Sequence, residues 1–282
     1  TNYNNYFGRI YQARYLAGIA AGLKSLETGN NNIGYVAAWG VEYAETCSGI
    51  NAFAMGAQAV NPEAKVYVNK ISTWGDEAKE RQAAINLIDT YNCGVIGQHC
   101  DSAQPQIAAQ EKGVFGCGYN SDMTADAPQA HLTAAIWHWD VYYQAAIETA
   151  MTCGGAENFV TEMGGNAYYA GLSEGFVDAS TLNELVAAPG TAAAMEAVRE
   201  LIDSGEWDVF SGVKLNITVD AEAGTAAVEQ VDAPLMSDGY ELKDGEVVEM
   251  ANPEIVPAGG ASVTDDVIKS GMNYNVAGVV EG

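Results

Sequence analysis

Residues 33–39 have the sequence IGYVAAW, a short β-rich run typical of a buried strand. Three later runs share this character: KVYVNKIS (65–72), CGVIGQ (93–98) and VFGCGY (114–119). The segments between these runs, at 42–60, 76–91 and 102–112, have helix-forming composition and length. Strands that alternate with helices at this spacing need crossover connections, which produce a parallel sheet covered on both faces. The sequence therefore predicts an α/β layer fold.

The sequence on either side of this α/β region predicts further helices and strands. Residues 7–26 carry apolar residues at roughly helical spacing, and Thr28, Gly29 and a run of asparagines then form a stop signal. Composition and glycine punctuation predict the other elements: a helix at 133–152, short strands within 159–178, a helix at 191–205, a strand at 207–213, an extended acidic region at 214–262 and a short helix at 265–272.

Length and charge limit the classes of function. A chain of 282 residues is long enough for two lobes of about 100 to 150 residues each. It carries 12 Lys and Arg against 37 Asp and Glu, which gives a formal net charge of −25. Such a charge opposes phosphate backbones and anionic membranes. We therefore expect no nucleic-acid partner, and neutral or cationic ligands.

Cysteine spacing and hydropathy give no sign of a disulfide framework or a membrane span. The five cysteines at 47, 93, 100, 117 and 153 contain no C-x-x-C pair, and an odd number leaves at least one unpaired. We expect them to be small core residues. No apolar run approaches the roughly 20 residues of a membrane helix, and no signal peptide is present in this sequence.

Polar and aromatic residues follow each of the four predicted strands. In an open parallel sheet, ligands bind beyond the carboxyl ends of the strands. An indole can cover the face of a planar ring, while carboxylates and amides pair with N–H and O–H groups on its edge. This inventory suits a nucleobase. The candidate ligand-binding residues from these strand ends are Trp39, Glu42, Trp74, His99, Asp101, Asn120 and Asp122.

Several of these residues also have a purely structural interpretation. A tryptophan at a strand end is more often part of the core, although Trp39 and Trp74 both adjoin glycines in loops. Asp76 precedes a helix, and we expect it to be an N-cap; Asp101 fits a cap or a site equally well. Asp122 also fits a turn residue.

Three catalytic or metal-binding signals are weak. The match of GLSEG (171–175) to G-x-S-x-G lacks the helix that a nucleophile elbow needs directly after the serine. His99, Cys100 and Asp101 are adjacent, so their side chains alternate in direction, and we expect no metal site there. No phosphate-binding loop motif occurs in the sequence, and no cofactor is expected.

Longer blocks of the sequence are similar to one family. ARYLAGIAAGL, STWGDEAKERQAA, GQHCDS, GYNSDM and LTAAIWHWDVYY occur in this order and resemble the basic membrane protein family of substrate-binding lipoproteins, over about residues 7–213. The resemblance implies a type I periplasmic-binding-protein fold. Its two α/β lobes close on a ligand that passes to an ABC importer. Residues 1–30 with 126–158 are assigned to the first lobe, and 31–125 with 159–282 to the second lobe and a C-terminal extension.

The resemblance also implies a ligand and a location. Family members with known ligands bind purine nucleosides or free purines, so a purine ligand, an ABC permease partner and no enzymatic activity are expected. The protein is expected to act outside the cytoplasm as a monomer, anchored as a lipoprotein by a segment outside this chain. GYNSDM resembles the family's acidic ligand-holding block, with Asn120 at the first acidic position and Asp122 at the second. That change weakens the expectation of ribose recognition.

Two further expectations concern the aromatic block and the start of the chain. If 133–152 is one helix, Trp137 and Trp139 lie about 200° apart and cannot both face one ligand. We assign Trp137 to the ligand cleft and Trp139 to the core. Family members begin with a strand–helix–strand segment of the first lobe, whereas this chain opens at what resembles the last helix of that lobe. We therefore expect that half of the cleft cannot be named from this sequence.

Two alternatives remain open at this point. One is a nucleoside hydrolase on a similar α/β scaffold, with Asp101 or Asp122 as general base and His99 as its partner. The other keeps the receptor fold but makes the protein a ligand-sensing domain that signals through a membrane partner.

Overall fold

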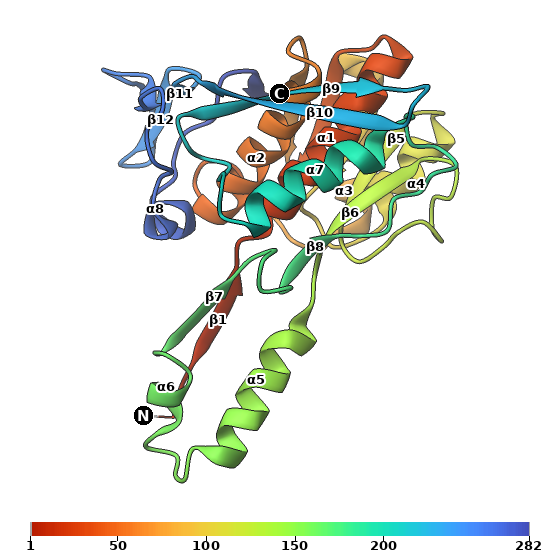
Figure 1. The fold of residues 1–282 in the computed structure, drawn as a ribbon. Coiled ribbons are helices and arrows are strands. Elements are labelled where there is room, and N and C mark those ends of the chain that lie inside the picture. The colour runs from red at the N-terminus through yellow and green to blue at the C-terminus, as the bar shows by residue number, and fades with distance from the viewer. Residues whose placement is uncertain (1, 282) are drawn as a thin grey trace.

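The computed structural model describes residues 2–281, and its centre is a seven-stranded sheet (Figure 1). The strand order is β15-β3-β2-β4-β5-β6-β8, and every neighbouring pair is parallel except β6 with β8. The predicted α/β fold with a parallel sheet is confirmed. The strands are β2 (Asn32–Ala37), β3 (Lys65–Lys70), β4 (Val95–Gln98), β5 (Phe115–Asn120), β6 (His131–Trp137), β8 (Val177–Ala179) and β15 (Val279–Glu281).

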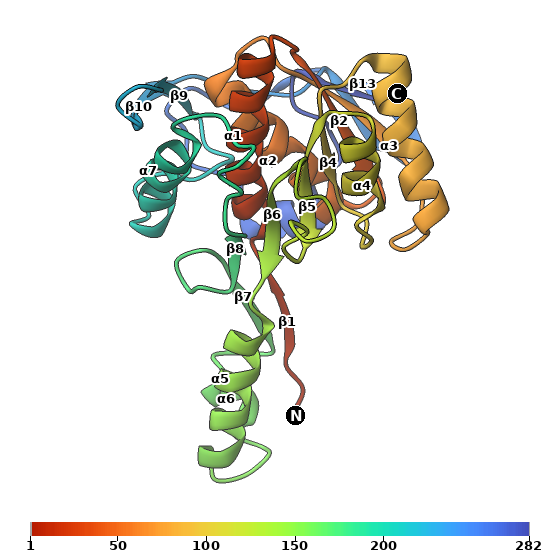
Figure 2. The ribbon, with the colours of Figure 1, turned by 90° about the vertical axis from the view of Figure 1, so that its right-hand side faces the viewer.

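Helices cover both faces of this sheet, as the two views show (Figures 1 and 2). One face packs against α1 (Ile10–Thr28) and α2 (Ala44–Val60), and α7 (Thr191–Asp203) packs on α1. The other face packs against α3 (Glu77–Tyr91) and α4 (Gln104–Glu111). Two hydrophobic cores therefore lie on opposite sides of the strands.

Helices α1 and α2 cross at very short range because glycines occupy their contact. A Cβ atom at Gly56 would lie 2.1 Å from the carbonyl oxygen of Tyr15, and one at Gly18 would lie 2.2 Å from that of Phe53. Residues 10–25 of α1 are all buried, so this helix is enclosed by the body of the protein. Its Arg14 and Lys24 are buried with it.

The aromatic block around Trp137 differs from the expected helix at 133–152. Residues 131–137 form strand β6, six of whose seven residues are buried, and α5 (Trp139–Thr152) begins only after His138. A fully buried parallel strand has no alternation of apolar and polar residues, so its sequence resembles a buried helix. The predicted strand at 207–213 is also wrong. Residues 207–212 form irregular structure with a turn at 209–210, and β9 begins at Val213.

An arm projects from the body on the side where β6 ends (Figures 1 and 2). We define the arm as β1 (Asn5–Gly8), α5, α6 (Phe159–Glu162) and β7 (Ala167–Ala170), in which β1 and β7 form a parallel pair. Tyr6 stacks on Tyr142 with ring centroids 4.0 Å apart. Aromatic contacts thus hold the strands of the arm against its helix.

The C-terminal third forms small antiparallel pairs, in agreement with the extended, turn-rich region expected there. The predicted helix at 191–205 is present as α7, and the one at 265–272 is present as α8. The bounds are β9 (Val213–Asp220), β10 (Thr225–Asp232), β11 (Leu235–Met236), β12 (Tyr240–Lys243), β13 (Glu246–Glu249), β14 (Glu254–Val256) and α8 (Asp265–Ser270).

The arrangement of lobes differs from the grouping expected from the sequence. Residues 1–30 and 126–158 were assigned together to a first lobe. In the structure, α1 packs on the main sheet and β6 is one of its strands, whereas β1 and residues 139–158 lie in the arm. Residues 10–25 of α1 are all buried, which places this helix inside the body and not in the arm.

All five cysteines are free thiols, and four of them are buried. The expected role as small core residues holds for Cys47, Cys93, Cys100 and Cys117, while Cys153 is half-buried in the arm. No helix within residues 2–281 is long and apolar enough to span a membrane.

Candidate functional site

The loops that follow β2, β3, β4 and β5 meet at one edge of the sheet. We call this edge the rim: residues 39–43, 71–76, 99–103 and 120–124. The amide N–H of Asp101 donates to the carbonyl oxygen of Trp74 at 2.9 Å, which joins the loops after β3 and β4. Asn120 Nδ2 donates to Asp101 Oδ1 at 2.8 Å, which joins the loops after β4 and β5. Parallel strands bring these polar groups together because all four end on the same side.

Half-buried aromatic rings line part of the rim. Trp74 meets Tyr43 edge to face, with ring centroids 6.2 Å apart and planes at 80°. Tyr43 is 51% exposed, so much of its ring is open to solvent. Trp39 is also half-buried in the loop after β2. An exposed ring beside a half-buried indole offers a surface on which a planar molecule can stack.

Two rim carboxylates have partners on the protein. Glu42 Oε1 accepts a hydrogen bond from Lys70 Nζ at 2.8 Å; burial opposes ionisation of Glu42, but this bond lowers its pKa overall. Burial also opposes ionisation of Asp122, but hydrogen bonds from the hydroxyl and amide of Thr124 lower its pKa. Both carboxylates therefore already accept hydrogen bonds from the protein, which leaves fewer acceptor positions for a ligand.

Asp101 differs from these two carboxylates. Burial raises its pKa, while the hydrogen bond from Asn120 opposes that rise. Its position after β4 does not make it a helix cap, because the N-cap residue of α4 is Ala103. Asp101 is thus an exposed rim carboxylate with one side-chain donor.

Asp76, in contrast, is the N-cap of α3 as predicted, and its side chain accepts from the amide of Lys79. The neighbouring Glu80 is fully buried, yet its oxygens accept from the amide of Asp76, the amide of Ser102 and the Ser102 hydroxyl. This network connects the loops after β3 and β4 from beneath and fixes the shape of the rim.

His99 does not reach the rim. Its amide continues the ladder by donating to the carbonyl oxygen of Val36 at 2.9 Å, and its side chain is fully buried. The ring lies edge to face against Tyr35 and Tyr119, and burial, together with the charge of Arg14, holds its pKa well below the usual value. Neither ring nitrogen has a hydrogen-bond partner among residues 2–281. His99 was expected to bind ligand because it follows β4, but it turns into the core.

Trp137 and Trp139 pack on each other rather than facing opposite ways on one helix. Their rings are stacked with centroids 4.5 Å apart and planes at 12°, and Phe176 meets both rings edge-on. Trp137 is 7% exposed, and its Nε1 donates to the hydroxyl of Tyr119 at 3.1 Å. The expectation that the two rings face opposite ways was wrong because Trp137 ends a strand and Trp139 begins a helix, and the role of Trp137 in ligand binding stays a prediction.

A hollow lies beside the rim, where the arm joins the body. We call it the junction hollow; it encloses about 230 Å³. Tyr43 belongs to the rim and also lines this hollow. Its lining residues are Asn5, Phe7, Gly8, Ile10, Tyr11, Tyr43, Glu45, Ser48, Tyr169, Ile268 and Lys269.

Sequence reasoning selected Trp39 and Glu42 from the loop after β2 but missed Tyr43 and Glu45 of the same segment. Glu45 belongs to the first turn of α2, and a carboxylate there would ordinarily be assigned to the helix dipole. The only available signal was its position at the start of the helix that follows β2. The hollow itself also needs residues from β1, β7 and α8, whose proximity is not visible in the sequence.

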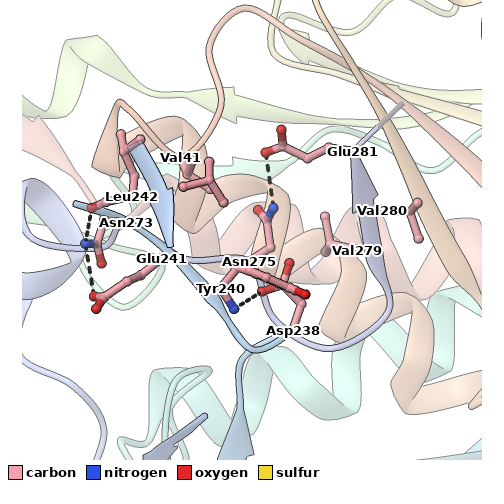
Figure 3. A pocket seen from close by; sticks show the side chains of 11 residues that line it. Val41, Asp238, Tyr240, Glu241, Leu242, Asn273, Asn275, Val279, Val280 and Glu281 are labelled. Atoms are coloured by element: carbon pink, nitrogen blue, oxygen red, sulfur yellow. Dashed lines mark hydrogen bonds between the residues drawn. The ribbon is translucent and has the colours of Figure 1, made fainter. Parts of the chain in front are cut away.

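A second hollow of about 310 Å³ lies between the C-terminal hairpin and edge strand β15 (Figure 3). Two asparagine side chains in this hollow contact glutamate carboxylates. Asn275 Nδ2 donates to Glu281 Oε1 at 3.2 Å, and Asn273 Nδ2 lies 3.5 Å from Glu241 Oε2. Burial and the charge of Glu281 raise the pKa of Asp238. Residues 2–281 contain no group of three or more His, Cys, Asp or Glu side chains placed to hold a metal ion.

The sequence matches the family described as ABC transporter substrate-binding protein PnrA-like over residues 1–203. The chain belongs to this family. Similarity to solved structures agrees with the fold of PnrA-like proteins. An ABC transporter solute-binding protein from Conexibacter woesei has a TM-score of 0.56 at 23% identity, and the match covers 73% of this chain and 64% of that chain. A solute-binding protein from Aeropyrum pernix has a TM-score of 0.55 at 17% identity, covering 78% and 68%.

Two curated relatives carry different ligand names. The chain is 43% identical over 148 residues to a putative ABC transporter glucose-binding protein of Haloferax volcanii, a match that covers 52% of this chain and 36% of that protein. It is 37% identical over 142 residues to a purine-binding protein of Brucella abortus, covering 50% of this chain and 39% of that protein. The chain thus spans well under half of the length of the curated relatives it matches.

Proposed function

We propose that this PnrA-like protein is an extracytoplasmic receptor that captures a purine or purine nucleoside and delivers it to an ABC permease. The observation that carries the proposal is the place of Tyr43, whose ring meets Trp74 on the rim and also lines the junction hollow. Aromatic rings and hydrogen-bonding carboxylates then meet at one place. The purine-binding relative from Brucella abortus supports the same ligand class.

The geometry favours binding of the ligand over its hydrolysis. A hydrolase on this scaffold would pair His99 with Asp101 or Asp122, but His99 is buried beneath the rim with no partner among the described residues. Asp122 Oδ1 instead lies 3.6 Å from Nε2 of His131, which is itself fully buried. Binding between two lobes, of which the arm contributes one side, would enclose the ring and leave it unchanged. We further propose that the receptor is a lipoprotein and acts as a monomer.

Glucose is a second candidate ligand, because the Haloferax volcanii relative is named for it. Indole faces, carboxylates and amides also suit a sugar ring. The two ligands differ in optical properties: purines absorb ultraviolet light and glucose does not.

The test is to denature the purified protein and identify any released molecule by mass spectrometry, then to titrate the ligand-free protein with purines, nucleosides and glucose by calorimetry. We expect a purine or nucleoside to bind with micromolar or tighter affinity, about −8 kcal/mol or better. Binding of glucose but of no purine would contradict the proposal. Recovery of free base and sugar from a nucleoside incubated with stoichiometric protein would instead reveal a hydrolase.

A further inference from the structure

Glu45 is a buried carboxylate with an acceptor atom that no described residue pairs with. The residue is 8% exposed, and its Oε1 atom has no hydrogen-bond partner among residues 2–281. The fully buried Glu80 shows what a structural carboxylate looks like here, because both of its oxygens accept hydrogen bonds. An unpaired buried acceptor destabilises a fold, so its presence needs a reason.

The nearest buried cation does not supply that reason. Arg14 Nη1 donates to the Tyr35 hydroxyl at 2.7 Å and to the carbonyl oxygen of Gln98 at 3.0 Å. Its guanidinium also covers the Tyr119 ring, 4.3 Å from the centroid. No ion pair within 4.0 Å joins Arg14 to Glu45 among the described residues. Burial raises the pKa of Glu45 and the positive charge of Arg14 opposes that rise, but the arginine leaves the hydrogen bonds of the carboxyl group unmade.

Glu45 does line the junction hollow, together with Tyr43 and Ser48 from the same helix start. Tyr169 is less free to stack on a ligand, because the side chains of Arg9 and Lys269 lie 5.0 and 4.7 Å from its ring centroid. Tyr43 is half-exposed, and its ring meets that of Trp74 edge to face. A planar molecule on Tyr43 would therefore bring its edge toward Glu45.

We propose that Glu45 determines ligand specificity by accepting hydrogen bonds from two adjacent N–H groups on the edge of a guanine-type ring. An ionised carboxylate is an acceptor only, with two oxygens side by side, so it pairs with neighbouring donors and not with a donor next to an acceptor. Guanine offers a ring N–H and an amino group in that order. Adenine offers a ring acceptor beside its amino group, and hypoxanthine lacks the second donor. This inference rests on the proposed purine-binding function.

The experiment compares the wild-type chain with Glu45→Gln and with the matched control Glu63→Gln. Glu63 is an exposed acid just beyond the other end of α2, so the control removes the same charge far from the hollow. Calorimetric titrations use guanine, hypoxanthine, adenine and glucose. We expect the wild type to prefer guanine over hypoxanthine, and Glu45→Gln to lose at least about tenfold in guanine affinity and most of that preference. Glu63→Gln should bind as the wild type does.

Thermal unfolding without ligand separates a ligand-binding role from a structural one. If Glu45 serves the ligand and not the fold, Glu45→Gln leaves the Tm unchanged or raises it, because the substitution breaks no hydrogen bond of the ligand-free protein. A marked fall in Tm would show that Glu45 supports the fold and would overturn the inference. Unchanged guanine affinity in Glu45→Gln, with normal purine binding by the wild type, would overturn the inference alone. Failure of the wild type to bind any purine would overturn the proposed function and the inference with it.

Discussion

Asn120 Nδ2 and Asp101 Oδ1 lie 2.8 Å apart, and this hydrogen bond joins the ends of the two central strands β4 and β5. Asn120 has φ of 67°, a left-handed conformation that asparagine tolerates better than most residues. The backbone therefore presents its amide directly to a carboxylate whose pKa burial raises. The pair sets both the shape and the charge of the rim.

Replacing Asn120 with Asp should make the rim sensitive to pH. Aspartate also tolerates the left-handed conformation, so the main change is a second carboxylate beside Asp101. We expect the Asn120→Asp variant to be less stable than the wild type at pH 7 by on the order of 1 kcal/mol, and to recover at pH 5 as the pair takes up a proton. Urea unfolding at the two pH values measures the difference. An equal loss of stability at both pH values would argue against charge repulsion.

Replacing Trp74 with Ala should weaken ligand binding if its ring helps to stack the ligand. We expect a loss of at least about 1 kcal/mol in binding free energy, measured by calorimetry with the ligand identified from the purified protein. Tyr240→Ala is the control, because Tyr240 is a similarly large ring, 53% exposed, in the C-terminal hairpin. Unchanged affinity in the Trp74 variant would remove this residue from the site.

Replacing Gly56 with Ala should destabilise the body. The added methyl group would lie 2.1 Å from the carbonyl oxygen of Tyr15 and would force α1 and α2 apart. We expect a loss of about 1–3 kcal/mol, although alanine is the better helix former. Gly75→Ala serves as the control, since a Cβ atom there has no neighbour within 4 Å. Similar stabilities of the two variants in urea would show that the helices can adjust to the methyl group.

His131 should make folding stability fall as the pH is lowered. Burial lowers its pKa to about 4, with Asp122 and Asp126 opposing, whereas the unfolded chain has a value near 6.5. The unfolded chain therefore binds more protons between these values. The stability from this residue, up to about 3 kcal/mol, is present above pH 6.5 and is lost as the pH falls toward 4.

The measurement is the slope of unfolding free energy against pH between 6.5 and 5. His131→Gln should reduce this slope relative to the wild type, while His138→Gln, a half-buried residue at the start of the arm, should change it less. A slope unaffected by His131→Gln would assign the pH dependence to other groups, such as the buried His99.

Added salt should stabilise the protein. A net charge of −25 produces self-repulsion in the compact state, and raising NaCl from about 0.1 M to about 1 M shortens the screening length from about 10 Å to about 3 Å. We expect the Tm to rise by several degrees. Sucrose at matched osmolality is the control, because it favours compact states without screening charge. An equal rise in sucrose would show that screening is not the cause.

The alternation of short β-rich runs and helix-forming segments was enough to predict the central layer of this fold. Strands β2, β3, β4 and β5 and the helices between them appear where the pattern places them. Local periodicity and composition are enough to predict this layer because each strand and each crossover helix of a parallel sheet can be recognised from its own stretch of sequence. The same local signals also predicted that the four strand ends would share an edge. They failed at β6, where a strand buried on both faces has no alternating pattern.

Tertiary structure alone decided which side chains at that edge face outward. His99 turns into the core, Trp137 packs on Trp139, and Glu45 comes to line a hollow completed by β1, β7 and α8. These outcomes depend on contacts between residues far apart in the chain, such as the 2.8 Å bond from Asn120 to Asp101. Sequence order records which residues follow a strand, but the packing of distant segments determines which of them remain accessible to a ligand.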